Sequence, residues 1–262
     1  MKNAVFFDID GTIWDGKFDI PDSVGPAIRK LRENGNLAFL CSGRAMSNIC
    51  SKELLDIGFD GTIAACGNHI EMNGEILYEN SLSHDQVELI IDVTKRCNMP
   101  IVLEGPFVHF ISSSGFEDDP YVDQLFERLG DRAKLLDKYD GKEPVNKFSA
   151  DILPDTDYDT IKNAVTPFMD IIMHEGNVIV EFIPKDTSKA TGIKWICDKL
   201  GIERDHIYAF GDSMNDISML KYAGHSVCMG GGAAEAKKAS EYVTADLWDD
   251  GIKKGLEHYG LI

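Results

Sequence analysis

The segment Ala4-Val5-Phe6-Phe7-Asp8-Ile9-Asp10-Gly11-Thr12 governs how the rest of this 262-residue chain is interpreted. Its first four residues form a short apolar run that ends abruptly in acid and glycine. Such a run is typical of a strand buried on both faces of a parallel sheet. Residues i and i+2 of an extended chain point the same way, so Asp8 and Asp10 can face one site. That site would lie at the carboxyl end of the strand, where open α/β sheets bind ligands.

An Asp-x-Asp pair alone is a weak signal, and the chain contains its own comparison. The stretch Asp155-Thr156-Asp157-Tyr158-Asp159 repeats the spacing in polar surroundings, where helix-capping or solvated acids are the expected interpretation. Only the Asp8 pair follows an apolar run and precedes a glycine. An acidic turn without function remains the other interpretation of that pair.

Strand and helix signals alternate at both ends of the chain. Helical spacing follows Pro21 and ends at Gly35. Further buried strands are expected at 37–40, 62–65, 206–210 and 225–229, and further helices at 45–57, 188–200 and 214–222. This order indicates an α/β sheet with right-handed crossovers.

The middle of the chain has a different texture. Strands are expected there at 101–103, 107–112, 147–153, 170–174 and 178–183, and helices at 84–97, 119–129 and 156–168. The last two strands, joined at Glu175-Gly176-Asn177, have the pattern of a hairpin. We therefore expect a Rossmann-like α/β core domain with a parallel sheet over 1–81 and 185–262, and an inserted α+β domain over 82–184.

Composition limits the partners of the protein. The chain has 26 basic and 44 acidic residues, a net charge of −18, which repels nucleic acids and anionic membranes. This charge also disfavours an anionic substrate unless a metal and basic groups reverse it locally. The six cysteines form no C-x-x-C pair and are expected to be reduced core thiols. Without a signal peptide or an apolar run of about 18 residues, a soluble cytoplasmic protein is expected.

Two further segments are candidates for binding an anion. Cys41-Ser42-Gly43-Arg44 follows the second strand, and a hydroxyl with free backbone N–H groups ahead of a helix makes an anion-binding corner. An ordinary N-cap serine is the other interpretation. Lys189 lies near the start of a predicted helix, where a lysine is usually a solvated surface charge.

A last segment supplies a second pair of acids. Gly211-Asp212-Ser213-Met214-Asn215-Asp216 directly follows the strand at 206–210. Asp212 and Asp216 are four residues apart, so a helical turn would bring them to one face. Hard oxygen ligands of this kind suit Mg²⁺. The alternative, an ordinary capped helix, explains less well than a metal site why two acids lie beside Asn215 at the end of a core strand.

Charge counting connects these segments. Asp8, Asp10, Asp212 and Asp216 would repel one another and any phosphate dianion if all four were ionised. One Mg²⁺ and Lys189 together contribute three positive charges, and a protonated Asp10 removes one negative charge. The interpretation as a phosphate site therefore requires Mg²⁺.

Together the four segments resemble the four motifs of the haloacid-dehalogenase-like superfamily. Their order, and the long insert between the second and third, resemble its Cof-type sugar-phosphatase branch over nearly the whole chain. The resemblance implies that Asp8 is a nucleophile forming an aspartyl-phosphate, and that Asp10 is general acid and then general base. It implies Mg²⁺ held by Asp8, the backbone carbonyl of Asp10 and Asp212, with Asp216 in support. The implied phosphate-binding residues are Gly11, Thr12, Ser42, Gly43, Lys189 and Asn215.

The resemblance also assigns residues 82–184 to a mobile cap that excludes water. Where the branch has Asn-Gly-Ala after the third strand, this chain has Cys66-Gly67-Asn68-His69, and Gly230-Gly231-Gly232-Ala233 replaces a common Gly-Asn-Ala. The first change lies near the passage from core to cap and weakens any transfer of substrate preference. Four cap residues are possible contacts of a leaving group, although we expect Phe107 in the core and the others solvated: Phe107, His109, Arg128 and Lys147.

The expected function is a Mg²⁺-dependent phosphatase acting on small phosphorylated metabolites, such as sugar phosphates, pyridoxal phosphate or flavin mononucleotide. A phosphotransferase of the phosphomutase type would use the same aspartyl-phosphate. A non-catalytic phosphate-binding regulator resembling a receiver domain is a third possibility. Asp10 argues against it, because a stable phospho-aspartate is not compatible with a general acid/base two residues away. The sequence does not indicate an oligomeric state.

Overall fold

The computed structural model describes residues 2–116, 119–173 and 178–262. The chain divides into two compact units. The core unit comprises 1–43, 51–79 and 187–262, and the insert unit comprises 44–50 and 80–186. The expected hairpin connection at Glu175-Gly176-Asn177 lies outside the described residues.

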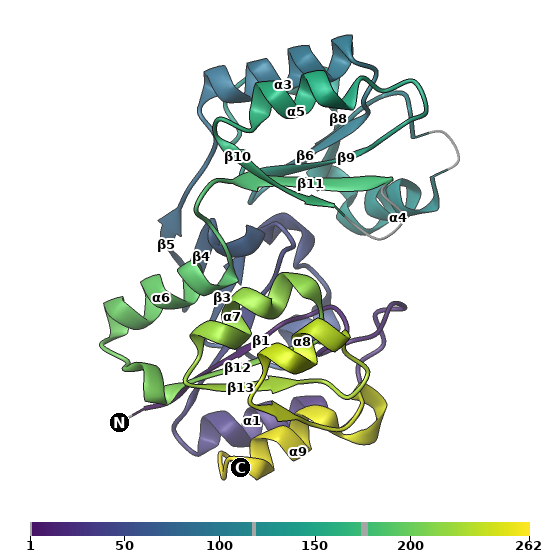
Figure 1. Ribbon diagram of the computed structural model, residues 1–262. Helices are drawn as coiled ribbons and strands as arrows, with labels where there is room; N and C mark the ends of the chain where they lie inside the picture. Colours follow the sequence, from purple (N-terminus) through teal and green to yellow (C-terminus); the bar gives the residue numbers. More distant parts are fainter. Residues whose placement is uncertain (1, 117–118, 174–177) are drawn as a thin grey trace. The chain divides into compact units, whose positions relative to one another are not determined.

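The core unit is built on an eight-stranded sheet in the order β14-β13-β12-β1-β2-β3-β4-β5 (Figure 1). The strands from β14 to β3 are parallel, and β4 and β5 are added antiparallel. The bounds are β1 (Ala4–Phe7), β2 (Leu37–Cys41), β3 (Gly61–Ala64), β4 (His69–Met72), β5 (Glu75–Glu79), β12 (Ile207–Gly211), β13 (His225–Cys228) and β14 (Tyr242–Val243).

Helices cover both faces of this sheet. Helices α1 and α9 pack together on one face, and α6, α7 and α8 follow one another on the other (Figure 1). The bounds are α1 (Val24–Glu33), α2 (Lys52–Leu55), α6 (Lys189–Leu200), α7 (Ile217–Tyr222), α8 (Ala234–Ala239) and α9 (Gly251–His258), with 3₁₀ turns η2 (Ala65–Gly67), η5 (Arg204–His206), η6 (Met214–Asp216) and η7 (Leu247–Asp249).

Strand β1 lies between β12 and β2 and is completely buried. Phe6 stacks on Phe39 of β2, with ring centroids 5.0 Å apart, and Phe7 packs on Phe210 of β12 at 5.0 Å. Burial of one such aromatic side chain contributes about 1.5–3 kcal/mol to the free energy of folding. Because these strands are parallel, the segments that follow β1, β2 and β12 leave the sheet at the same edge. Three of the four candidate segments are those segments.

The insert unit has a six-stranded sheet in the order β10-β11-β9-β6-β7-β8, antiparallel except for the pair β7–β8. Helices α3 and α5 cover one face, and α4 packs on Val102 and Ile111 of the other. The bounds are η1 (Met46–Asn48), α3 (His84–Arg96), β6 (Ile101–Glu104), β7 (His109–Ile111), α4 (Pro120–Leu129), η3 (Gly130–Arg132), β8 (Ala133–Leu135), η4 (Leu136–Lys138), β9 (Lys147–Asp151), α5 (Tyr158–Val165), β10 (Met169–Met173) and β11 (Ile179–Pro184).

These two units confirm the predicted fold class, an α/β core with an inserted α+β part. The predicted domain limits, 1–81 with 185–262 and 82–184, stay a prediction. Asp157 caps α5 by accepting a hydrogen bond from the Thr160 amide, which agrees with the helix-capping interpretation of the acids at 155–159. Among the described residues, no helix has both the length and the apolar character needed to span a membrane.

The continuous helix expected over 45–57 is wrong. The chain instead forms the 3₁₀ turn η1, breaks, and starts the short helix α2 at Lys52. Ser51 caps α2 by accepting from the Leu54 amide, and the Asn48 side chain accepts from Arg128 Nε at 3.0 Å. Ser51 thus binds a backbone amide, and serine and asparagine are poor interior helix residues because their side chains compete for backbone groups.

The expected exposure of three residues in the insert, Phe107, His109 and Lys147, is also wrong. Phe107 is 48% exposed, whereas Lys147 is 2% exposed. The Lys147 ammonium lies 3.4 Å from Glu104 and 3.1 Å from Glu181, and His109 is buried beside Glu104 as well. A charged group is buried when such partners replace water, and neither carboxylate was predictable from the local sequence.

Candidate active site

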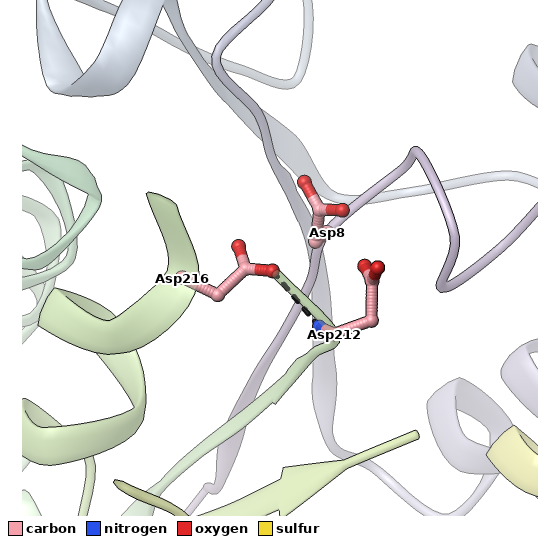
Figure 2. Close-up of side chains that lie close together, drawn as sticks. All are labelled: Asp8, Asp212 and Asp216. Atoms are coloured by element: carbon pink, nitrogen blue, oxygen red, sulfur yellow. Dashed lines mark hydrogen bonds between the residues drawn. The ribbon is translucent and has the colours of Figure 1, made fainter. Parts of the chain in front are cut away.

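Three carboxylates meet at the carboxyl edge of the core sheet (Figure 2). Asp8 directly follows β1, and its amide donates to Phe210 O of β12 at 2.9 Å. Asp212 directly follows β12, and Asp216 ends the turn η6. One carboxylate oxygen from each of these three residues lies within 4.8 Å of the others. The structure therefore brings together residues about 200 positions apart in the sequence, as the motif interpretation expects.

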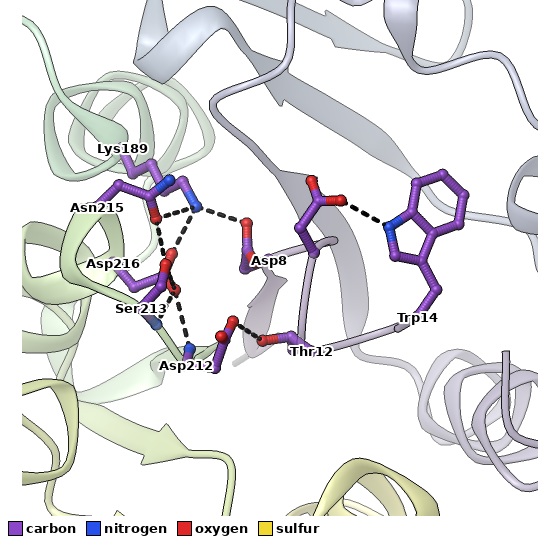
Figure 3. A network of polar contacts seen from close by, with 9 residues as sticks. Asp8, Thr12, Trp14, Lys189, Asp212, Ser213, Asn215 and Asp216 are labelled. Atoms are coloured by element: carbon purple, nitrogen blue, oxygen red, sulfur yellow. Dashed lines mark hydrogen bonds and ion pairs between the residues drawn. The ribbon is translucent and has the colours of Figure 1, made fainter. Parts of the chain in front are cut away.

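Lys189 connects two of these acids. It is the first residue of α6, after the N-cap Ser188, and it is 1% exposed. Its Nζ donates to Asp8 Oδ1 and to Asp216 Oδ1, both at 2.5 Å, and to Asn215 Oδ1 at 3.3 Å (Figure 3). The lysine is thus not the solvated surface charge of the ordinary interpretation.

Asp216 holds the loop that carries Asp212. Its Oδ2 accepts hydrogen bonds from the amides of Asp212 and Ser213, each at 2.9 Å, while Lys189 binds Oδ1. Because both oxygens are engaged, the geometry favours a supporting role for Asp216. Ser213 was missed by sequence reasoning, although its position three residues before an acid is the pattern of a capping box.

The loop after β1 touches the loop after β12 through Gly11 and Thr12. Gly11 has a φ of +83°, and a Cβ there would lie 2.4 Å from Asp212 Oδ2. Only glycine permits both this conformation and this approach. Thr12 is fully buried and donates to Asp212 Oδ1 at 3.1 Å.

Asp10 is placed differently from Asp8. It is exposed, and its Oδ1 accepts a hydrogen bond from the indole Nε1 of Trp14 at 2.8 Å. Its carboxylate does not belong to the cluster of three acids, which is compatible with the expected metal contact through its backbone carbonyl. Trp14 was also missed by sequence reasoning.

The segment Cys41-Ser42-Gly43-Arg44 lies beside Asn215 of the segment that follows β12. Ser42 is buried, and its backbone pairs with Ile63 O at 2.8 Å and with the Cys66 amide at 3.1 Å. A Cβ on Gly43 would lie 3.6 Å from the amide nitrogen of Asn215. All the predicted site residues belong to the core unit. Lys189 begins α6, and the others lie in segments that follow β1, β2 and β12.

The unusual turn at Cys66-Gly67 packs against Ser188, the residue before Lys189. Ala65, Cys66 and Gly67 have φ values of +49°, +54° and +95°. A Cβ on Gly67 would lie 2.4 Å from the carbonyl oxygen of Ser188, the N-cap of the helix that begins with Lys189. This departure from the family pattern thus lies against the start of α6.

Burial and mutual repulsion set the protonation of the site. Burial and then the charge of Asp216 raise the pKa of Asp8 well above its usual value, although Lys189 opposes the shift. Burial and Asp216 also raise the pKa of Asp212 to about 6. Burial opposes protonation of Lys189, but Asp216 and Asp8 outweigh it and raise the lysine pKa.

The same residues fit a divalent cation. With Asp8, Asp212 and Asp216 ionised and Lys189 protonated, the cluster carries two excess negative charges. Its donors are carboxylate oxygens in a buried position, the ligand type that Mg²⁺ prefers. A bound cation would reverse the repulsion that raises the carboxylate pKa values.

A family model described as haloacid dehalogenase-like hydrolase matches residues 5–256. The chain belongs to this family. The protein YkrA of Bacillus subtilis is 29% identical over 100% of this chain and 99% of its own. The phosphoglycolate phosphatase of Methanobrevibacter smithii is 24% identical over 99% of both chains. The 5-amino-6-(5-phospho-D-ribitylamino)uracil phosphatase YitU of Bacillus subtilis is 25% identical over 97% of this chain and 96% of its own.

Two solved structures share the fold over the whole chain. A hypothetical protein from Geobacillus kaustophilus HTA426 superposes with a TM-score of 0.86 at 27% identity, and each chain is covered completely. The subclass IIB sugar phosphatase BT4131 superposes with a TM-score of 0.80 at 24% identity, again over both complete chains. The comparisons confirm the family and the enzyme class predicted from the motifs, a phosphatase of the haloacid dehalogenase-like hydrolases.

Proposed function

We propose that the protein is a Mg²⁺-dependent phosphatase that hydrolyses small phosphomonoesters, sugar phosphates or related metabolites, through an aspartyl-phosphate on Asp8. The observation that carries this proposal is the environment of Asp8. Its carboxylate is 3% exposed, is held through Oδ1 by Lys189, and lies next to Asp212 and Asp216. A buried carboxylate with one oxygen fixed presents its other oxygen as a nucleophile in a constant direction.

The proposed reaction has two steps. In the first, Asp8 Oδ2 attacks phosphorus, the ester P–O bond breaks, and Asp10 gives its proton to the leaving oxygen. In the second, Asp10 takes a proton from water as the water oxygen attacks phosphorus. The Asp8–phosphorus bond then breaks, which restores the carboxylate and releases inorganic phosphate.

Positive charge around the phosphoryl group comes from two sources. When bound through Asp8, Asp212 and the Asp10 carbonyl, Mg²⁺ supplies charge that offsets the phosphoryl oxygens and the acids. Lys189 supplies a fixed ammonium group at the same place. The other proposed phosphate contacts are the hydroxyls, amides and backbone N–H groups of Gly11, Thr12, Ser42, Gly43 and Asn215.

The names of the relatives agree with a small, phosphorylated substrate. Phosphoglycolate, a phosphorylated ribitylaminouracil and sugar phosphates are named for three of them. We extend to this chain only their shared chemistry, a phosphomonoester on a small polar molecule. Residues 82–184 are proposed to act as a cap that excludes water, and the site of action is proposed to be the cytoplasm.

Release of inorganic phosphate from a panel of small phosphate esters tests this function, with Mg²⁺ and with a chelator. Wild type and Asp8→Asn are compared, because the neutral amide cannot attack phosphorus while the side-chain volume is kept. We expect Mg²⁺-dependent release by wild type alone. Equal release by Asp8→Asn would contradict the nucleophile, and phosphate found on an added sugar alcohol instead of in solution would indicate a phosphotransferase.

A further inference from the structure

The loop after β1 folds Trp14 back onto Asp10. The amides of Thr12, Ile13 and Trp14 all donate to Ile9 O, at 3.3, 2.9 and 3.2 Å. The chain then reverses, and the Gly11 amide donates to Trp14 O at 2.9 Å. Residues 10 and 14 consequently form an isolated bridge, with the indole beside the carboxylate.

The indole ring is also held by packing. Trp14 is 1% exposed and meets the Phe18 ring in a T-shaped contact, with centroids 5.1 Å apart. Phe18 is held by the next turn, where its amide donates to Asp15 O at 3.0 Å and Asp15 Oδ1 accepts from the Asp19 amide at 3.1 Å. A buried, packed ring therefore aims its only N–H group at an exposed carboxylate.

The two acids of the first motif are thus held by partners of different chemistry. Asp8 is bound by the Lys189 ammonium, which favours the carboxylate that a nucleophile must be. Asp10 Oδ1 is bound by a neutral indole N–H at 2.8 Å. An N–H group of this kind can donate a hydrogen bond to a carboxylate and also to the carbonyl oxygen of a carboxylic acid. The contact can therefore persist while Asp10 alternates between acid and base.

We propose that Trp14 is a positioning residue for Asp10, an inference that rests on the function proposed above. Trp14 fixes Oδ1, so that the proton is carried on Oδ2 and is delivered in one direction to the leaving oxygen. The gain is one of orientation, because an exposed carboxylate samples several rotamers and only some of them point Oδ2 at the leaving oxygen.

The test is Trp14→Phe, which keeps an aromatic ring and removes the N–H group. The quantity compared is kcat/KM with Mg²⁺ for two probes, a sugar 6-phosphate and p-nitrophenyl phosphate. The alkyl leaving oxygen of the sugar needs a proton, whereas p-nitrophenolate departs without one. We expect kcat/KM to fall about tenfold to a hundredfold for the sugar phosphate and less than about twofold for the aryl ester. Equal losses for both esters, or no loss for either, would overturn the proposal.

Two further measurements separate positioning from folding. β-(3-Benzothienyl)alanine at position 14 replaces N–H by sulfur at nearly constant shape, and we expect it to reproduce the selective loss; wild-type kinetics would overturn the proposal. Trp248→Phe, at a site 57% exposed, is the matched control and should have the kcat/KM of wild type for both esters.

In the ¹H–¹⁵N spectrum, Asp10→Ala should shift the indole signal of Trp14 but not those of Trp195 and Trp248. An unmoved Trp14 signal would exclude the contact in solution. Failure of wild type to hydrolyse either ester would instead overturn the proposed function.

Discussion

Replacing Lys189 by methionine removes the buried ammonium group that holds Asp8 and Asp216 while keeping most of the side-chain volume. The two carboxylates lose partners at 2.5 Å and remain beside Asp212. Removing one partner of a buried ion pair typically lowers the free energy of unfolding by about 3–5 kcal/mol. We expect a loss of this size at pH 7 without metal.

The loss should depend on pH with a defined sign. The pKa of Asp212 is raised from 3.8 to about 6, and that of Asp8 is also raised, so both acids bind protons more readily folded than unfolded. Their contribution to stability is therefore present at low pH and lost as pH rises through the raised pKa values. Lys189→Met raises these pKa values further, so we expect less than half of the destabilisation at pH 5.

Urea unfolding in EDTA, followed by circular dichroism at pH 5 and pH 7, measures both quantities. Lys194→Met is the matched control, since Lys194 lies in the same helix, is 60% exposed, and pairs with Asp198 at 2.5 Å. An exposed pair of this type contributes little to stability, because water screens it. A Lys189→Met loss no larger than that of the control, or an equal loss at both pH values, would show that charge compensation at Asp8 is not what this lysine provides.

Three other changes have defined outcomes. Asp8→Asn should abolish phosphate release and leave the thermal midpoint of unfolding close to that of wild type or above it, because a buried negative charge is removed; a large drop would mean a structural role. Saturating Mg²⁺ should stabilise wild type by about 2.7 kcal/mol at one hundred times its Kd, and more weakly at pH 5 where Asp212 is protonated; an equal Tm shift at pH 5 and pH 7 would exclude these ligands. Gly67→Ala should destabilise the protein by about 1–3 kcal/mol and lower kcat/KM, since its Cβ would meet Ser188 O. The control Gly231→Ala, whose Cβ meets nothing closer than 3.6 Å, should change neither stability nor kcat/KM.

The buried strands of the core were predictable because their residues are apolar on both faces. The run at Ala4–Phe7 has the pattern of a strand buried in a parallel sheet, and parallel neighbours place the following acids at one edge. Strands β4 and β5 were missed because they mix apolar and charged residues. His69 is fully buried there with both ring nitrogens bound, by Glu71 two residues along β4 and by Glu79 opposite it on β5, and the Glu79 contact is set by the register of the two strands.

The roles of single side chains were harder to predict than the strands. Nothing local distinguishes Lys189 from a solvated lysine, since its burial follows from the packing of α6 against the sheet. Trp14 is an apolar residue in a short loop, and its bond to Asp10 depends on the chain reversal at Gly11. The acids were predictable because two pairs with defined spacing each follow a strand.

A covalent phosphate on Asp8 is the feature that distinguishes the proposed mechanism from direct attack of water. Wild type would be mixed with Mg²⁺ and a phosphate ester that it hydrolyses, and the reaction would be quenched within one turnover. The quenched protein would then be treated with borohydride, which reduces an aspartyl-phosphate to homoserine. Mass spectrometry of the peptide containing residues 4–17 then locates the change. We expect homoserine at position 8, absent without Mg²⁺ and absent from Asp8→Asn. Homoserine at position 10 or 212, or none at all during active turnover, would contradict the assignment of Asp8 as the nucleophile.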